Sequence, residues 1–262
     1  MGLPRAPLRV WESNLAYYKH VWRSNLIGSF VQPMLYMLGM GVGVGALVDR
    51  GPGASTVLDG VDYFAFLAPA LIATTAMTIV TQEALWPVMD GFMWSRRFEA
   101  MTATPVTPSE VALGTALWLG TRAFVCATGV AVVLLFFDDT RTWGLAVAVA
   151  AAVLTGMAFA MPIMAFSSSR ESPDQSFAAL QRFAIIPMFL FAGAFYPVEQ
   201  LPGWLQPVAY VTPLWHGIEL CRDAVLGRLE LGPAALNVAA LTAFTVVGYA
   251  FARRTFATRL GR

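Results

Sequence analysis

The sequence predicts an all-α integral membrane protein with six transmembrane helices, an N-terminal amphipathic interfacial helix and outer re-entrant helices. Hydrophobic residues make up 57% of the 262 residues and charged residues only 13%, against about 45–50% and about 25% in soluble domains. The mean hydropathy is +0.62, and the long apolar runs do not alternate with period two as β-barrel strands do. This composition excludes a soluble globule, a disordered chain, a coiled coil and collagen.

The first predicted element is an amphipathic helix over residues 8–23. Trp11, Leu15, Tyr18 and Trp22 are spaced by 4, 3 and 4 residues, so they share one helical face, and basic residues occupy much of the rest. This pattern is typical of a helix at the inner membrane interface. Two interpretations stay open, a juxtamembrane anchor or a lever that contacts a cytoplasmic partner. Because the first 23 residues lack the apolar core of a signal peptide, we expect the next apolar run to stay in the membrane.

Six later runs are long and apolar enough to be spans, since a spanning helix needs about 20 mostly apolar residues. They cover 26–48, 63–82, 111–137, 143–166, 177–196 and 236–251, within one domain over 1–262. Gln181, Arg182 and Pro187 interrupt the fifth run. The glycines at 39, 41, 43 and 45 lie inside the first run, where they predict close helix packing.

The distribution of basic residues predicts the orientation. Six spans put both termini on one side, and twelve of the 17 Lys and Arg residues lie on that side, against four on the other and Arg122 inside the third run. By the positive-inside rule both termini are cytoplasmic. We therefore expect a multi-pass protein of the inner (plasma) membrane. The net charge of +1 gives no general attraction for nucleic acid.

Motifs for enzymatic chemistry are missing from the sequence. The single lysine, Lys19, has no glycine-rich phosphate loop before it, and no hydrolytic signature occurs. His216, Glu219 and Asp223 would share a helical face, which suits a divalent ion, but Glu219 has Arg222 at i+3 as an alternative partner. Cys126 and Cys221 form neither a disulfide framework nor a zinc motif. We expect no enzyme activity, no metal site and no cofactor in this chain.

The loop over residues 85–110 is apolar although it is predicted to be cytoplasmic. It carries the large aromatics Trp86, Phe92, Trp94 and Phe98 beside Arg96 and Arg97, a composition that favours a docking surface, with packing on the membrane surface as the alternative. Thr107, Pro108 and Glu110 predict a capping box at the start of the third span.

Arg122 lies about eleven residues into the third span, where an unpaired charge costs several kcal/mol. Glu83, at the inner end of the second span, is the favoured partner by depth. A structural ion pair and a substrate contact both remain open for Arg122.

The mid-membrane composition predicts the kind of compound that crosses. Phenylalanine, methionine and leucine predominate there, with Phe189 and Phe191 in the fifth span. Such a wall suits the apolar part of an amphiphile, whose polar head would use Arg122, Gln181 or Arg182. We therefore place Arg122, Glu83, Phe189 and Phe191 on a translocation pathway.

Residues 197–232 are too broken by proline to span the membrane. Thr212 and Pro213 predict the N-cap and first position of a helix that runs through His216 to Val225. Short re-entrant helices on the outer side fit this segment if protein buries their backbone groups.

The apolar loop at 85–110, Arg122 inside the third span and the proline-broken outer segment together resemble the ABC-2 family of ATP-binding-cassette exporter permeases. The most similar branch is that of the nodulation-factor exporters, followed by the daunorubicin-type drug exporters. The resemblance covers nearly the whole chain, and the following residues carry it: Phe92-Met93-Trp94, the run from Ala100 to Pro108, Phe195-Tyr196-Pro197 with Leu201-Pro202, and the run from Pro213 to Arg222. The family implies an exporter of lipid-linked saccharides, glycolipids or drugs, and a dimer of identical or paralogous permeases with spans 1 and 5 at the seam.

The resemblance also implies a partner and roles for residues. Two separate ATPase subunits would bind the ATP and Mg, and a coupling helix at 87–102 and the N-terminal helix would contact them. The implied ATPase-coupling residues are Trp11, Tyr18, Phe92, Trp94, Arg96, Arg97, Phe98, Glu99 and Met101. The implied outer gate comprises Phe195, Tyr196, Pro197, Pro213, His216 and Arg222. A channel or secondary transporter is the alternative, although the acidic relays that it needs are missing from the spans; an intramembrane enzyme lacks a catalytic constellation.

Overall fold

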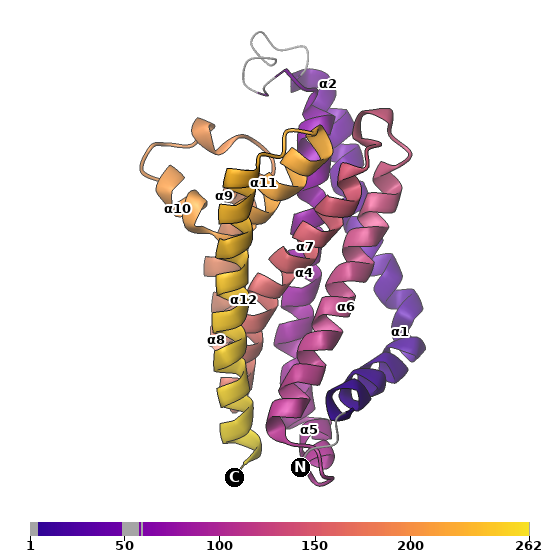
Figure 1. Ribbon diagram of the computed structural model, residues 1–262, viewed down its shortest axis with the longest axis vertical. Helices are drawn as coiled ribbons and strands as arrows, with labels where there is room; N and C mark the ends of the chain where they lie inside the picture. The colour runs from indigo at the N-terminus through magenta and orange to yellow at the C-terminus, as the bar shows by residue number, and fades with distance from the viewer. Residues whose placement is uncertain (1–4, 49–57, 59, 262) are drawn as a thin grey trace.

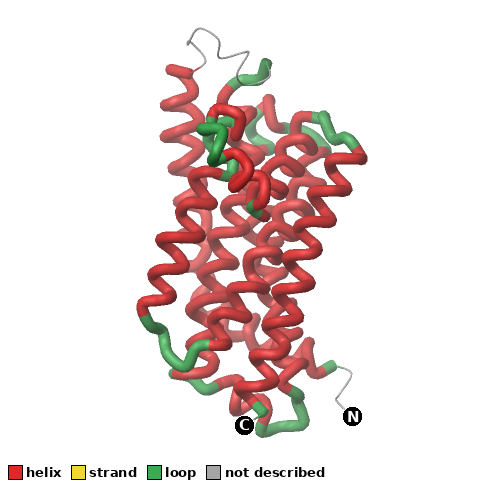
Figure 2. Tube along the Cα trace, turned by 90° about the vertical axis from the view of Figure 1, so that its left-hand side faces the viewer, coloured by secondary structure: helices red, strands yellow, loops and turns green. Residues whose placement is uncertain are grey.

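The computed structural model describes residues 5–48, 58 and 60–261, and every regular element in that part of the chain is a helix. The helices form one elongated bundle with loops at its two ends (Figure 2). Arg50 and Arg262, both counted in the topology prediction, lie outside the described residues, as do the side chains of 21, 23–30, 32 and 42.

The N-terminal helix and the first predicted span are one continuous helical run. Helix α1 (Ala6–Tyr36) passes into a wider π-helical segment, η1 (Met37–Val44), and then α2 (Gly45–Val48). The predicted boundary between 23 and 26 is absent because neither proline nor glycine occurs there to stop the helix. Figure 1 shows the indigo first part of α1 crossing the lower end of the bundle obliquely and its later part rising along the bundle. The wider turns of η1 follow Pro33, which has no N–H for the helical ladder.

The second span is longer than predicted. Helix α4 covers Tyr63–Met93, so it takes in the first part of the predicted coupling helix at 87–102. The residues between 84 and 92 continue it because most of their apolar side chains are buried, Leu85, Met89 and Phe92 among them. The chain then turns at Arg96, which has a left-handed φ of 48°, and a separate short helix, α5 (Arg97–Thr102), follows. The predicted coupling helix is therefore two elements with a sharp turn between them.

The third and fourth spans lie close to their predicted positions. Helix α6 covers Pro108–Leu134 and α7 covers Gly144–Ser169, with a 3-10 turn, η2 (Asp138–Thr140), between them. The capping box is present, because Thr107 Oγ1 accepts from the Glu110 amide at 3.4 Å and the Thr107 amide donates to Glu110 Oε2 at 2.8 Å. Helix α6 thus begins three residues before the predicted start at 111, and it ends three residues before the predicted end at 137.

The fifth predicted span, 177–196, is divided into shorter helices. Helix α8 (Gln175–Leu180) leads into a π-helical turn, η3 (Gln181–Ile185), and α9 (Ile186–Phe191). Pro187 in the first turn of α9 explains the wide turn before it, because proline offers no N–H to the preceding carbonyls. The regular helix ends at Phe191, and Gly193 follows with a φ of +81° that favours glycine.

The outer segment holds short helices, and the last helix is longer than predicted. A 3-10 turn, η4 (Val198–Gln200), precedes α10 (Gln206–Val211) and α11 (Pro213–Leu226). Helix α12 covers Leu231–Leu260 instead of 236–251, so it includes the last two residues of the predicted outer segment. The start of α1 and the end of α12 lie at the same end of the bundle (Figure 1).

Among the described residues, four helices are long and apolar enough to cross a membrane: α4, α6, α7 and α12. The first and fifth predicted spans correspond to shorter apolar stretches, Pro33–Val48 and Gln175–Phe191. The count of six crossings therefore stays a prediction, and so does the re-entrant path of α10 and α11.

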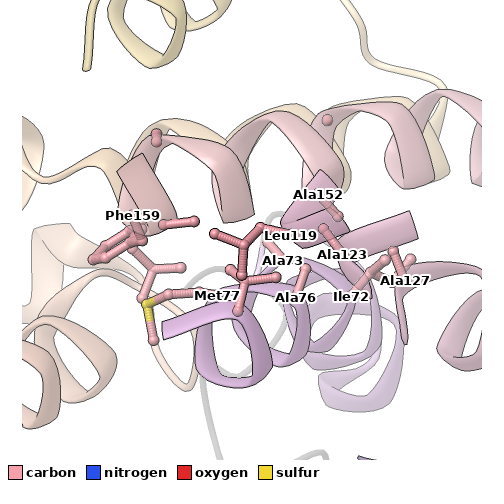
Figure 3. Close-up of a cluster of buried hydrophobic side chains, with 14 of the residues drawn as sticks. Ile72, Ala73, Ala76, Met77, Leu119, Ala123, Ala127, Ala152 and Phe159 are labelled. Atoms are coloured by element: carbon pink, nitrogen blue, oxygen red, sulfur yellow. The ribbon is translucent and has the colours of Figure 1, made fainter. Parts of the chain in front are cut away.

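Small residues let the central helices approach closely. Helix α4 packs on α6 and α7, and alanines from the three helices belong to one buried cluster with Leu119, Met77 and Phe159 (Figure 3). A Cβ added at Gly217 of α11 would lie 2.0 Å from Thr155 Oγ1 of α7, and one added at Gly248 of α12 would lie 2.5 Å from Pro162 Cδ of α7. In the predicted glycine run, a Cβ added at Gly41 would likewise clash with the Phe64 ring of α4. Helix contact through small side chains is the usual packing in membranes.

Candidate translocation and coupling sites

A buried ion pair connects α4 and α6. Arg122 donates from Nε to Glu83 Oε1 at 2.9 Å, and the side chains are only 3% and 17% exposed. The pair predicted from depth is therefore present. Arg122 also donates from Nη1 to the hydroxyl of Tyr18 at 2.7 Å, and its guanidinium lies 4.4 Å from the Tyr18 ring centroid. Because its donors face Glu83 and Tyr18, the geometry favours the structural-pair interpretation over a substrate contact.

The aromatic face of the N-terminal helix packs on α6. Trp11 donates its indole N–H to Thr121 Oγ1 at 2.9 Å, and Tyr18 packs edge-on against Trp118 with centroids 5.5 Å apart. Gly114 lies so close that a Cβ there would be 2.5 Å from the Pro7 carbonyl oxygen. Trp11 and Tyr18, assigned to ATPase coupling by the resemblance, therefore fasten α1 to the bundle in this structure.

The turn after α4 divides the predicted coupling residues into buried and exposed groups. Phe98 is fully buried, with its ring centroid 4.9 Å from that of Phe92 and 5.4 Å from that of Phe256 in α12. A Cβ at Gly91 would lie 2.3 Å from the Phe98 ring, so only glycine leaves room for it. Phe92 and Phe98 thus hold α5 on α4 and α12. The exposed members of the predicted set are Trp94, Arg96 and Glu99, and Met101 is half-buried.

The α1–α4–α9 groove, as we call it here, contains the predicted pathway residue Phe189. Its lining residues are Pro33, Tyr36, Leu71, Thr74, Thr75, Thr78, Ile79 and Phe189. The enclosed space is small, about 20 Å³, and the Phe189 ring packs against Tyr36 and Phe195. Thr74 and Thr78 donate their hydroxyls to carbonyls of their own helix. Phe191 lies outside this groove and is about one-third exposed.

Arg222 connects the outer segment to the bundle. It donates to Glu219 Oε1 at 2.7 Å, to the Gly193 carbonyl at 2.8 Å and to the Phe66 carbonyl of α4 at 3.4 Å. Its guanidinium also lies 3.8 Å from the Phe66 ring centroid. Arg222 thereby fixes α11 against α4 and against the turn that follows α9.

The other predicted gate residues have separate contacts, and only Pro197 shares a cavity with Arg222. Pro213 begins α11 after Thr212, whose hydroxyl accepts from the Trp215 amide at 3.3 Å. Phe195 accepts at its carbonyl from Tyr63 at 3.0 Å, and Pro197 lines a cavity of about 400 Å³ that also reaches Glu219 and Arg222. Tyr196 is half-buried. His216 faces away, with Nδ1 2.7 Å from Asn237 Oδ1 of α12.

The suggested metal ligands do not converge. His216 contacts Asn237 and Glu219 pairs with Arg222, and the described residues contain no group of three His, Cys, Asp or Glu residues placed to hold an ion. The polar-face interpretation of this helix fits the geometry.

Three contacts in these clusters were not predicted from the sequence. Tyr18 was predicted on the aromatic face of the helix but not as the partner of Arg122. Asn237 as the partner of His216 and the Gly193 carbonyl as a partner of Arg222 were not identified. Asn237 is an amide side chain in a mostly apolar run, which was the available signal for a buried contact. A backbone carbonyl carries no signal in the sequence.

Comparison with known proteins gives consistent matches over most of the chain. A family model described as ABC-2 type transporter matches residues 9–226. The chain is 32% identical over 255 residues to Nodulation protein J of Rhizobium leguminosarum bv. viciae, and the matched stretch covers 97% of this chain and 95% of that protein. It is 34% identical over 242 residues to Nodulation protein J of Rhizobium meliloti (strain 1021), at 92% and 89% coverage. The Inner membrane transport permease YadH of Escherichia coli is 20% identical over 240 residues, at 92% and 90% coverage.

Proposed function

The chain belongs to the ABC-2 type transporter family, as the membrane subunit of an ABC transporter, and we propose that it works with a separate ABC ATPase and exports an amphiphilic, lipid-like compound. The compound would be a glycolipid, a lipid-linked saccharide or an amphiphilic drug, taken from the inner leaflet or the cytoplasm. Hydrolysis of ATP with Mg on two copies of the separate ATPase would drive export. The multi-pass chain would lie in the inner membrane with both termini cytoplasmic.

The observation that carries this proposal is the apolar character of the surface around the α1–α4–α9 groove. Phe183, Ile186 and Leu190 are exposed on η3 and α9, and Val31, Met34 and Leu35 are exposed on α1. A polar solute would lose its hydrogen bonds with water against these side chains, at a cost of about 2 kcal/mol or more for each polar group. An acyl or other apolar chain loses none.

The polar head of the compound would meet few groups in this region. Arg122 is already bonded to Glu83 and Tyr18. Of the three residues predicted to contact the polar head, Gln181 and Arg182 therefore remain. Gln181 donates to Gln82 Oε1 at 3.0 Å, and Arg182 is exposed. We propose that these two residues contact the head and that Phe189 contacts the apolar part.

The same apolar faces support a second permease copy, identical or paralogous. Unpartnered large side chains on α1 and α9 are lipid-exposed in a single chain and would be shared across a seam in a dimer. We propose that the ATPase contacts the end of the bundle where α1 begins and α12 ends. The exposed residues there are Trp94, Arg96 and Glu99.

Reconstitution with the cognate ATPase tests the proposal. Amphiphiles should stimulate ATP hydrolysis and be transported, whereas small polar solutes should do neither. Phe189→Ser should weaken this stimulation, and Phe251→Ser, an exposed position on α12, is the matched control. Stimulation by small polar solutes alone would overturn the proposed substrate class. Failure to co-purify with an ATPase would overturn the coupling.

A further inference from the structure

A cavity between the N-terminal helix and the bundle is a separate feature from the groove. It measures about 250 Å³ and lies where α1, α4 and α6 meet near α5; Tyr17, Tyr18, Glu83, Pro87, Arg97 and Trp118 are among its lining residues. Ligand pockets for drug-sized molecules are usually about 300–1,000 Å³. This cavity therefore fits a smaller group.

Arg97 contributes a cation to this cavity without a paired carboxylate. Its Nη2 donates to the Pro87 carbonyl at 2.9 Å, while Nε is buried and has no hydrogen-bond partner. No carboxylate within the described part of the chain forms a salt bridge with it. Burial lowers the pKa of Arg97, although Asp90, Tyr17 and Glu83 oppose this change. An arginine remains charged under all ordinary conditions, so the cavity contains an incompletely neutralised cation.

Glu83, the carboxylate that lines the cavity, is already engaged by Arg122. Tyr18 accepts a hydrogen bond from Arg122, so its own O–H can still donate. Arg97 lines the cavity, and because its Nε is buried, the donors left for a ligand are the Nη N–H groups not bonded to the Pro87 carbonyl, together with the phenolic O–H of Tyr18. This donor set matches a phosphate, to which arginine can donate two parallel hydrogen bonds.

The depth of the cavity points to a lipid as the source of the phosphate. Its wall on α4 extends from Glu83 to Val88, just beyond the apolar run that ends at residue 82. Tyr17, Tyr18 and Trp118 line it, and tyrosine and tryptophan are typical of the headgroup level of a membrane. Basic pockets between helices on the cytoplasmic side suit anionic headgroups.

We propose that this cavity binds the phosphate of an anionic phospholipid headgroup from the inner leaflet, held by Arg97 and Tyr18. The bound lipid would supply the counter-charge that Arg97 lacks and would bridge α1 to α4 and α5. Phe189, Gln181 and Arg182, to which we assign the exported compound, do not line this cavity, so the proposal does not depend on which compound is exported.

The test measures lipid binding to the purified full-length chain in neutral detergent by native mass spectrometry. The probes are phosphatidylglycerol, diacylglycerol without phosphate, and inorganic phosphate. Arg97→Gln should weaken phosphatidylglycerol binding about tenfold or more, the loss expected for one charge-assisted contact. Arg96→Gln, which removes the same charge from the adjacent exposed position, should leave binding unchanged. Diacylglycerol should bind weakly and equally to all variants.

Three outcomes would overturn the proposal. One is equal weakening by Arg97→Gln and Arg96→Gln, which would indicate a general charge effect. Another is unchanged phosphatidylglycerol binding in Arg97→Gln, and the third is inorganic phosphate binding as tightly as the lipid, which would assign the site to a soluble anion. Arg97→Lys covers the case in which Arg97→Gln does not fold, because it keeps the charge and loses the paired donors. It should bind with intermediate affinity, and wild-type affinity would count against the assigned geometry.

Discussion

The Arg122–Glu83 pair gives the sharpest stability prediction. Arg122→Ala would leave the Glu83 carboxylate in the bundle without its cation, and Glu83→Ala would leave the guanidinium with only Tyr18. Breaking a buried ion pair costs about 3–5 kcal/mol. The Glu83 side chain is 17% exposed, so we expect each single change to fall near the lower end, about 3 kcal/mol.

The double variant separates a specific pair from two independent losses. Arg122→Ala with Glu83→Ala removes both charges, so no uncompensated charge stays behind, and its cost should be clearly less than the sum of the two single costs. Tyr18→Phe should cost about 1 kcal/mol because it removes one hydrogen bond and keeps the ring against the guanidinium.

The assay is equilibrium unfolding in mixed micelles, followed by a spectroscopic signal for helix content. Arg182→Ala is the control, since Arg182 is exposed on η3 and its loss should change stability little. Agreement of the double variant with the sum of the singles to within about 0.5 kcal/mol would refute the reasoning.

Two further predictions concern the packing of α5 against the bundle and the packing between the long helices α7 and α12. Phe98→Ala should destabilise the protein by about 3–5 kcal/mol because the ring is fully buried, while Trp94→Ala should leave unfolding unchanged and reduce ATPase stimulation in the reconstituted complex. The reverse pattern would show that the exposed and buried roles are exchanged. Gly248→Ala should cost about 1–3 kcal/mol because its Cβ would lie 2.5 Å from Pro162 Cδ, whereas Gly39→Ala enters open space. Equal unfolding midpoints for these two alanine variants would contradict the packing argument.

Much of the fold follows from sequence alone because hydropathy and capping are local properties. The four long apolar helices were predicted from their apolar runs, and the start of α6 from Thr107, Pro108 and Glu110. Helix ends were less accurate where packing sets them. Helix α4 continues past residue 82 because Leu85, Met89 and Phe92 are buried, and this burial depends on neighbours that a local pattern does not describe.

The candidate sites were predicted less completely. Glu83 was identified as the partner of Arg122 because depth in the membrane can be counted along the chain. The inward position of Phe98 was missed, since an aromatic residue in an apolar loop gives the same sequence pattern whether it docks on a partner or packs on its own bundle. Tyr18 was placed on the correct helical face, but the face alone does not name Arg122 as its contact.

By itself, the sequence determined that this chain is a helical membrane protein, where its long apolar helices lie and which charge needs a partner. Each of these follows from transfer free energies that add up residue by residue along the chain. Only the tertiary structure decided which side chains meet: Tyr18 with Arg122, Arg222 with the Phe66 and Gly193 carbonyls, and Arg97 with a cavity in place of a carboxylate. Those contacts depend on the rotation and spacing of helices, which are set by close packing at small residues far apart in the sequence.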